Sequence, residues 1–263
     1  GIWTARWNGR ADGDAMIVDA MLADAAAQAK DRKPPRMAAW SVGRCVRQNW
    51  FMEHDFTPEP MQGRAILRFE LGDLVEEAVC QRIEKTGIDF LRTDQRKLDN
   101  LVVPVLGFRC RSDFVFSCPD DLSLTGKSTL EVGELVVVAY RDTPPAKGEV
   151  CGGEIKSMSN YAFEKAQSGI LDDGYLAQIE CNIRALAVRW WCCIAYRAET
   201  ANLCEIWVCR DDARWQRIQA DVAAVRSPHR PDRPYRLDEA CTGAKTGACV
   251  GGKTPGRGQP HRP

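Results

Sequence analysis

The sequence predicts an α/β fold in which a mixed central sheet is flanked by helices. Stretches with helical spacing alternate along the chain with short runs rich in Val, Ile, Phe and Trp. Their order is helix, strands, helix, strands, which points to a sheet covered by helices. A content of 44% hydrophobic and 27% charged residues is that of a globular chain able to bury a sizeable core.

Five segments carry helical spacing. The second has the clearest apolar stripe, and Gly87 is its natural stop. Ser41 is the expected N-cap of a short segment that follows the Pro34-Pro35 break. The expected helices are residues 16–30, 64–85, 161–167, 175–188 and 211–225.

Strand-like runs lie between these helices. The last two are expected to form a β-hairpin because they are rich in Trp, Ile and Val and lie close together in the chain. The expected strands are residues 101–105, 113–116, 135–140, 149–156, 189–196 and 203–208.

The chain changes character at Ser227, after which Pro, Gly, Arg, Lys and Thr dominate and periodicity is lost. Such a tail is expected to be disordered or ordered only by a ligand. We therefore expect an N-terminal helical segment (residues 1–35), a folded core (36–226) and a C-terminal tail (227–263).

The charge balance restricts the function classes. With 36 basic and 36 acidic residues, the chain is not expected to bind DNA over its whole surface as a histone does, although a local basic groove remains compatible. No apolar run approaches the roughly 18 residues of a membrane span. No basic and apolar signal segment stands at the start, so we expect a cytoplasmic protein without a membrane partner.

Twelve cysteines are many for such a chain, yet no CxxC pair occurs that would indicate a zinc ribbon or a thioredoxin-type site. Seven of them lie in apolar strand or helix contexts, where core cysteines act as small hydrophobic residues. These seven are Cys80, Cys110, Cys181, Cys192, Cys193, Cys204 and Cys209.

The motif most informative about chemistry is Gly152-Gly153-Glu154-Ile155-Lys156-Ser157 at the end of an expected strand. Because side chains alternate along a strand, Glu154 and Lys156 point to one face, about 7 Å apart. The carboxylate can hold a hard divalent cation, and the lysine can orient water or stabilise charge on a phosphorane. Alone, the pair is more often an exposed salt bridge on a strand than part of a catalytic site.

Three further residues strengthen this interpretation when taken together. Asp113 begins a hydrophobic strand and could supply a second metal ligand from a neighbouring strand. Glu76 lies within the long helix, and Gln178 lies in a helix of otherwise apolar rhythm. For both helical residues the alternative is an ordinary solvated face.

In this order the motifs resemble the RecB-like branch of the PD-(D/E)XK nuclease superfamily, over roughly residues 36–200. The branch includes RecB and AddB nuclease domains, a CRISPR-adaptation iron–sulfur exonuclease and phage exonucleases. The matching elements are a helix with G-x-x-x-H/E (Gly72, Glu76), an Asp before a strand (Asp113), E-x-K (Glu154, Lys156) and a helix with the Gln of Q-x-x-x-Y (Gln178). The resemblance implies a restriction-endonuclease-like core within residues 36–226.

The resemblance also implies the roles of these residues. Asp113 and Glu154 would bind Mg²⁺ or Mn²⁺, with Glu76 as a further metal contact. Lys156 would be the catalytic lysine, and Gln178 would contact the DNA backbone or the site.

The chain departs from the family pattern in two places within the core. Asn182 stands where the family has Tyr, and the long spacing from Asp113 to Glu154 requires an inserted hairpin. Asp142, much nearer to Glu154, is therefore a rival for the metal-binding acid, although its Arg-Asp-Thr-Pro-Pro context is typical of a turn.

The segment Ser41-x-Gly43-x-Cys45-x-Arg47 is similar to the part of this branch that carries a cluster cysteine. The resemblance implies a [4Fe-4S] cluster on Cys45, Cys241 and Cys249, with a fourth ligand from elsewhere. The alternative is a disordered tail with two unpaired thiols.

The function expected from the sequence is metal-dependent cleavage of DNA, by an exonuclease acting on single-stranded or duplex ends, with a protein partner left open. The resemblance implies a role in recombination, repair or phage DNA processing, in the host cytoplasm if a phage encodes the protein. The alternatives are a catalytically silent DNA-binding subunit and a structural adaptor that keeps the nuclease fold.

Overall fold

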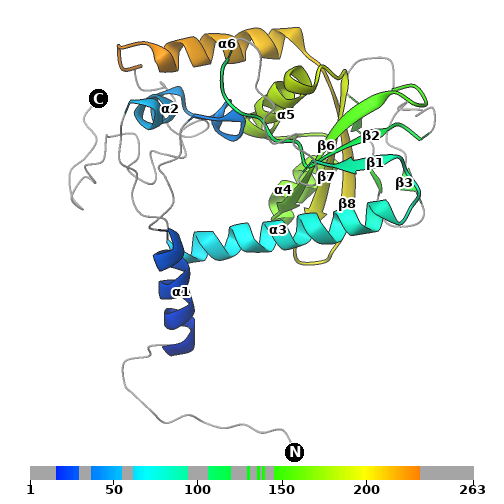
Figure 1. Ribbon diagram of the computed structural model, residues 1–263, viewed down its shortest axis with the longest axis horizontal. Coiled ribbons are helices and arrows are strands. Elements are labelled where there is room, and N and C mark those ends of the chain that lie inside the picture. The colour runs from blue at the N-terminus through cyan, green and yellow to red at the C-terminus, as the bar shows by residue number, and fades with distance from the viewer. Residues whose placement is uncertain are drawn as a thin grey trace, which may run out of the picture. The chain divides into compact units, whose positions relative to one another are not determined.

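The computed structural model describes residues 16–29, 37–54, 62–93, 106–119 and 145–231, together with short strands at 129–130, 135–136 and 138–139 (Figure 1). The chain divides into two compact units. The first comprises residues 1–33 and 59–71, and the second comprises residues 34–58 and 72–263. Helix α3 (Gly63–Glu84) begins in the first unit and ends in the second.

The first unit contains α1 (Met16–Ala29) and the first turns of α3. Ala25 and Ile66 are its buried apolar residues among those described. At Gly63 a Cβ would collide with the carbonyl of Leu22, so only a glycine lets α3 begin this close to the α1 backbone. The helices expected at residues 16–30 and 64–85 are both confirmed.

The second unit is built on a six-stranded mixed sheet with the order β1-β2-β6-β7-β8-β5. The central pair, β6 and β7, is parallel, as is the pair of β5 and β8, and all other neighbours are antiparallel. The six strands are β1 (Phe90–Arg92), β2 (Phe114–Ser117), β5 (Val138–Ala139), β6 (Val150–Met158), β7 (Trp190–Arg197) and β8 (Leu203–Cys209).

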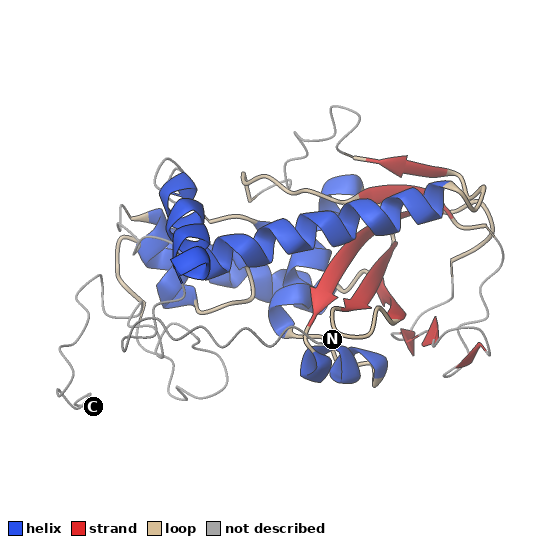
Figure 2. Ribbon diagram, turned by 90° about the horizontal axis from the view of Figure 1, so that it is seen from below, coloured by secondary structure: helices blue, strands red, loops and turns tan. Residues whose placement is uncertain are grey.

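Each face of this sheet is covered by helices. The second half of α3 crosses one face, where Val75, Val79 and Cys80 pack against strand residues such as Phe114 and Trp207 (Figure 2). Helices α4 (Asn160–Gln167) and α5 (Asp173–Leu186) cover the opposite face. The predicted mixed sheet flanked by helices is confirmed.

A further layer lies outside α5. Helices α2 (Val46–Glu53) and α6 (Asp212–Arg226) pack against each other, and α6 also packs against α5. In Figure 1, α6 runs along the top of the unit with α2 and α5 beneath it. Trp50 Nε1 donates a hydrogen bond to the Ser227 carbonyl at 2.8 Å, which fastens α2 to the end of α6.

Most expected elements are found within one or two residues of their expected bounds. The hairpin at residues 189–208 is β7 and β8, and the helices expected at 161–167, 175–188 and 211–225 are α4, α5 and α6. The inserted hairpin between Asp113 and Glu154 is present as β3 (Thr129–Leu130) and β4 (Leu135–Val136). The strand expected at residues 101–105 and the tail beyond residue 231 lie outside the described residues.

Ser41 does not have the expected role. It ends a short 3-10 helix, η1 (Ala39–Ser41), in which its hydroxyl bonds the backbone of Ala38. Helix α2 begins only at Val46, with Cys45 at its N-cap position. The reason is Gly43, which takes a left-handed φ of 77° and turns the chain between the two helices.

Two properties of the described residues bear on the earlier expectations. All seven cysteines assigned to the core are buried. Among the described helices, none combines the length and the apolar character needed to cross a membrane.

Candidate active site

Strand β6 presents Glu154 and Lys156 side by side on the face covered by α4 and α5. Glu154 is 1% exposed, the Lys156 side chain is 21% exposed, and Lys156 Nζ lies 3.2 Å from Glu154 Oε2. Ile155 points to the other face and packs in the cluster formed with α3. The one-face arrangement expected from the strand periodicity is therefore present, but the pair is buried and is not a surface salt bridge.

The two glycines ahead of Glu154 allow aromatic rings to press against β6 from both sides. A Cβ at Gly152 would collide with the ring of Trp191, and a Cβ at Gly153 would collide with the ring of Phe114. Both rings are buried. This close packing holds the strand firmly next to the residue that carries the candidate catalytic carboxylate.

Asp113 is fixed directly beside this pair. It precedes β2, whose register places Phe114 opposite Gly153 on β6. The Asp113 N–H donates to the Gly153 carbonyl at 3.1 Å, and Asp113 Oδ2 accepts a hydrogen bond from the Ile155 N–H at 2.8 Å. Two contacts to the β6 backbone thus hold the Asp113 side chain next to the Glu154–Lys156 pair.

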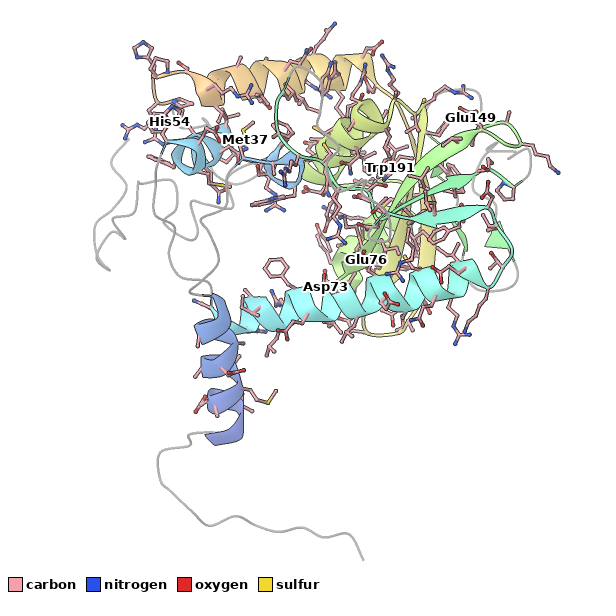
Figure 3. All side chains as sticks on the ribbon, viewed as in Figure 1. Met37, His54, Asp73, Glu76, Glu149 and Trp191 are labelled. Atoms are coloured by element: carbon pink, nitrogen blue, oxygen red, sulfur yellow. The ribbon has the colours of Figure 1, made fainter. Side chains whose placement is uncertain are left out.

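Glu76 reaches the same place from α3, on the side of the helix that faces the sheet (Figure 3). Its carboxylate lies 3.6 Å from Arg111 Nη2, and the charges that act on it include Asp113, Asp73 and Lys156. Glu76 therefore lies near Asp113.

The carboxyl groups have unusual proton affinities. Burial, with a smaller contribution from Asp113, raises the pKa of Glu154 to about 7, although Lys156 opposes the shift. Burial and the negative charge of Asp113 likewise raise the pKa of Glu76 to about 7, against the opposing charge of Arg111. Burial also raises the pKa of Asp113, although Lys156 and the Ile155 N–H counteract it. Three acids thus share a site that holds too little positive charge for all of them.

Lys156 remains a cation. Its burial would lower the pKa, but the negative charges of Glu154 and Asp113 outweigh this and raise the pKa above its ordinary value. A protonated lysine cannot accept a proton from water at neutral pH. Its chemical use in this site is to neutralise negative charge on a bound group.

Tyr175 is a site residue that the sequence analysis did not identify. It lies half-buried in the first turn of α5, and burial raises the pKa of its phenol, on which the charges of Lys156 and Glu154 also act. The available signal was its position three residues before Gln178, on the same side of the helix.

Gln178 itself is half-buried on α5, and no described contact links it to the three acids or to Lys156. Asn182, one turn later, is buried and donates from Nδ2 to the Arg111 carbonyl at 3.1 Å. Asn182 therefore anchors the segment that leads into Asp113. The family pattern has a tyrosine in place of Asn182.

The donor set fits a hard divalent cation in part. Neither oxygen of the buried Glu154 carboxylate accepts a hydrogen bond from any described residue, although Lys156 pairs with it at 3.2 Å. Oxygen ligands of this kind suit Mg²⁺ or Mn²⁺. In the described part of the chain, however, no three His, Cys, Asp or Glu side chains converge as a ready metal cluster. The arrangement thus places the carboxyl groups of Asp113 and Glu154 next to each other, with Glu76 near Asp113.

Of the remaining candidate residues, only Cys45 lies in the described part of the chain. Cys45 is buried at the start of α2, whereas Cys241, Cys249 and Asp142 lie outside the described residues. The cluster and the choice between Asp113 and Asp142 therefore remain predictions.

Comparison with known proteins identifies no family. No protein-family profile matches the chain, and no curated protein matches it. Among solved structures, the chain is similar to LHK-Exo in complex with dAMP, with 15% identity, a TM-score of 0.39 and coverage of 71% of this chain and 88% of that chain. LHK-Exo from Laribacter hongkongensis is described as an alkaline exonuclease, and this second structure of it aligns at 14% identity, a TM-score of 0.39 and coverage of 71% and 89%.

The structure of SSO0001 aligns at 12% identity and a TM-score of 0.38, over 82% of this chain and 90% of that chain. Similarities this distant leave the function of the present chain to be inferred from its own residues.

Proposed function

We propose that the protein is a metal-dependent nuclease that hydrolyses phosphodiester bonds in DNA. The observation that carries the proposal is the buried Glu154 carboxylate, whose one described partner is the ion pair with Lys156 at 3.2 Å, although it lies beside Asp113. A buried carboxylate with a single partner, next to a second acid, is unfavourable for folding alone. Its retention is understandable if the site binds a cation that the folded chain does not itself provide.

In this proposal Asp113 and Glu154 hold Mg²⁺ or Mn²⁺, and Glu76 orients or completes the ligand set through its position next to Asp113. When bound, such an ion supplies Lewis-acid catalysis and lowers the pKa of a coordinated water. Water attacks the phosphorus, the P–O bond to the leaving oxygen breaks, and the water proton passes to solvent or to the leaving group. Lys156 stays protonated and neutralises the charge that builds up on the phosphate oxygens.

The preferred substrate class is a DNA end. Exonucleolytic cleavage of single-stranded or duplex ends, in recombination, repair or phage DNA processing, follows from the resemblance of the motifs to RecB-like nucleases. Sequence-specific cleavage would require an element that reads base edges in a groove, and the sequence indicates no such element.

The test is degradation of linear single-stranded and double-stranded DNA with Mn²⁺ and, separately, with EDTA. Cleavage with Mn²⁺ alone is expected. Lys156→Ala should abolish cleavage while changing DNA affinity only a few-fold, because one lysine contributes little to total phosphate binding. The matched control is Lys147→Met, which replaces an exposed lysine in the turn before β6 and should cleave DNA normally. Equal degradation with and without metal, or wild-type rates in Lys156→Ala, would contradict the proposal.

An iron–sulfur cluster is a separate part of the proposal. The support from the described residues is the position of Cys45 at the start of α2, together with the hydrogen bonds from α2 to Ser227 and Pro231. These bonds bring the chain that leads to Cys241 and Cys249 past the helix that follows Cys45. Anaerobically purified protein should then be brown, and Cys45→Ser should bleach it, whereas Cys192→Ser should leave the visible spectrum unchanged. Colourless wild-type protein would remove the cluster and leave the nuclease proposal intact.

A further inference from the structure

A pocket of about 400 Å³ opens between α4 and the beginning of α5. Its base includes Met158 at the end of β6, and its walls include Tyr161 and Lys165 of α4 and Tyr175 of α5. None of the motifs identified in the sequence analysis accounts for this pocket.

The pocket lies immediately next to the candidate active site. Met158 is two residues beyond Lys156 on the same face of β6, so the two side chains are about 7 Å apart along the strand. Tyr175 forms part of the wall, and the charges of both Lys156 and Glu154 act on its phenol. A group bound in the pocket would therefore be a close neighbour of a phosphate bound at Lys156.

The outer wall of the pocket is an aromatic ring with a cation against it. Tyr161 is 69% exposed, and Lys165 Nζ lies 4.6 Å from the centroid of its ring. Ile170, which is 57% exposed, adds an apolar surface to the same pocket. An exposed aromatic ring beside a lysine is the combination with which proteins hold unpaired nucleic-acid strands, because the ring stacks on a base and the cation pairs with the adjacent phosphate.

The acidic residues of the pocket favour a base over a phosphate as its occupant. Asp172 and Asp173 both line it, and Asp172 Oδ1 is already used as the N-cap that accepts the Gly174 N–H at 2.8 Å. Two carboxylates repel a phosphate, but a carboxylate accepts hydrogen bonds from the exocyclic amino groups of bases. Charge thus assigns the base to the interior of the pocket and the phosphate to Lys165 at its rim.

We propose that this pocket binds the unpaired nucleobase next to the scissile phosphate, stacked on Tyr161. The inference rests on the proposed nuclease function and specifies its substrate as a single strand or a frayed end. A base that remains paired and stacked in a duplex cannot enter such a pocket unless it is first extruded.

Binding can be measured separately from cleavage. A single-stranded oligonucleotide that carries 2-aminopurine is titrated with the full-length protein in EDTA, where metal-dependent cleavage does not occur. Wild-type protein should quench the 2-aminopurine fluorescence. Tyr161→Ala should lose the quenching and bind roughly tenfold more weakly, the size expected for one lost base–aromatic stack. Tyr161→Phe should retain both properties because it keeps the ring.

Cleavage then tests the position of the base. With Mn²⁺, an abasic site next to the cleaved bond should raise KM roughly tenfold for the wild type, but should have little further effect on Tyr161→Ala. Lys165→Met should raise KM, whereas Lys147→Met, which removes a lysine at the other end of β6, should not. Because Tyr161 is largely exposed, its replacement should leave the melting temperature unchanged.

The outcomes separate the two proposals. Suppose that the wild type cleaves DNA, that Tyr161→Ala behaves like the wild type, and that the abasic substrate behaves like intact DNA. The pocket then does not hold a base, although the nuclease function stands. If the wild type never cleaves but shows Tyr161-dependent quenching, the base pocket stands and the nuclease function is wrong. Equal affinity for a blunt duplex and for a single strand would overturn the single-strand inference.

Discussion

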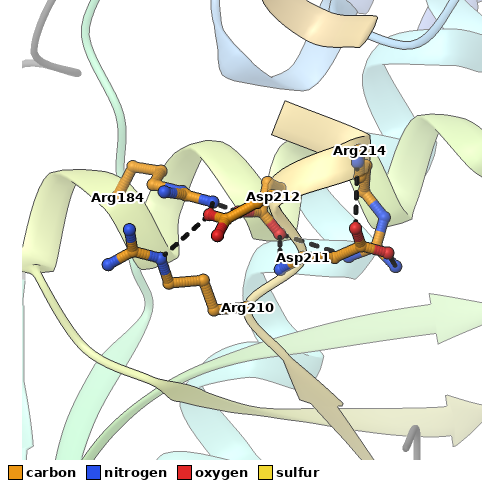
Figure 4. Close-up of polar contacts among 6 residues, drawn as sticks. Arg184, Arg210, Asp211, Asp212 and Arg214 are labelled. Carbon is orange, nitrogen blue, oxygen red and sulfur yellow. Dashed lines mark hydrogen bonds and ion pairs between the residues drawn. The ribbon is translucent and has the colours of Figure 1, made fainter. Parts of the chain in front are cut away.

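Two glutamates of this protein are almost completely buried, and their surroundings differ in an instructive way. Glu180 on α5 is 0% exposed and receives Arg184 Nε at 2.8 Å, Arg214 Nη1 at 3.3 Å and the Asp211 N–H at 2.9 Å. Figure 4 shows the further partners of these two arginines: Arg184 also pairs with Asp212, and Arg214 with Asp211. Glu154 on β6 is 1% exposed, and its one described ion-pair partner is Lys156.

The difference separates a carboxylate that serves the fold from one available to a ligand. The Glu180 oxygens are saturated by donors from two helices and the loop before α6, so a bound ion would have to displace them. The Glu154 oxygens accept no described hydrogen bond and share their site with two further acids. Burial raises the pKa of both carboxyl groups, so the lack of donors and not the pKa shift distinguishes Glu154, and acids left with so few partners gather at functional sites.

The largest expected effect concerns catalysis. Glu154→Gln should reduce DNA cleavage by a factor of about 10² to 10³ or more, because it removes a charged ligand from the reacting centre. Glu180→Gln is nearly isosteric as well. The fraction of this variant that folds should cleave DNA at a rate close to wild type. Initial rates on a labelled oligonucleotide with Mn²⁺ measure both. Comparable losses in the two variants would abolish the distinction drawn between the two residues.

The second effect is on stability, where replacing Glu180 should matter more than replacing Glu154. Glu180→Ala should lower the free energy of unfolding by about 3 to 5 kcal/mol, because Arg184 and Arg214 would lose their buried partner and keep only the more exposed Asp212 and Asp211. Glu154→Gln should leave it unchanged or raise it, since burial of that carboxylate is poorly compensated. Urea denaturation in EDTA at pH 7.5 compares the two variants. A strongly destabilised Glu154→Gln protein would show that Glu154 also supports the fold.

The third prediction is a pH dependence that originates at Glu154 and its neighbours. Its pKa of about 7 in the folded protein lies above the ordinary value of 4.5. Between these values the folded protein holds a proton that the unfolded chain has released, so stability falls as pH rises through this window and is level outside it. The loss attributable to Glu154 is on the order of 3 kcal/mol.

Thermal melts of the metal-free protein at pH 5, 6, 7 and 8 should show this decline, and Glu154→Gln should flatten part of it. Addition of Mn²⁺ should raise the melting temperature most at the higher pH, where the acids are deprotonated and can bind the ion. A metal-induced shift that does not depend on pH would place the binding elsewhere.

The smallest effect is expected at the exposed edge of the Glu180 network. Asp212 is 75% exposed and lies 2.6 Å from Arg184 Nη2. Exposed ion pairs contribute little because solvent screens them, so Asp212→Ala should lower the free energy of unfolding far less than Glu180→Ala does. Denaturation curves of Asp212→Ala and Glu180→Ala, recorded together, show whether the stabilisation resides in the buried part of the network. A larger loss in Asp212→Ala would reverse that assignment.

The sequence was sufficient to predict features that depend on local periodicity. Alternation along β6 places Glu154 and Lys156 on one face, and the position of Asp113 at the start of β2 brings it beside them. Helical spacing predicted α3, α5 and α6 closely. The three-residue strand β1 was missed because three residues are too few to establish a period of two.

The features that escaped prediction depend on contacts between distant segments. The partners of Glu180 include Arg214, which lies 34 residues away, and nothing in the sequence around either residue indicates the other. Tyr175 belongs to the candidate site because the N-terminal turn of α5 lies over the end of β6, a placement set by packing. Gln178 was chosen by motif resemblance, and its side chain has no described contact with the acids.

The paired glycines of β6 determine how this site could change. Any side chain at position 152 displaces Trp191, and any side chain at position 153 displaces Phe114, so a saturation mutagenesis screen scored for folded protein should recover glycine almost exclusively at both positions. Single substitutions at these two positions would therefore disrupt the strand that carries Glu154 and Lys156. New substrate preferences, whether evolved or engineered, would have to arise in the exposed residues of α4 and the first turn of α5.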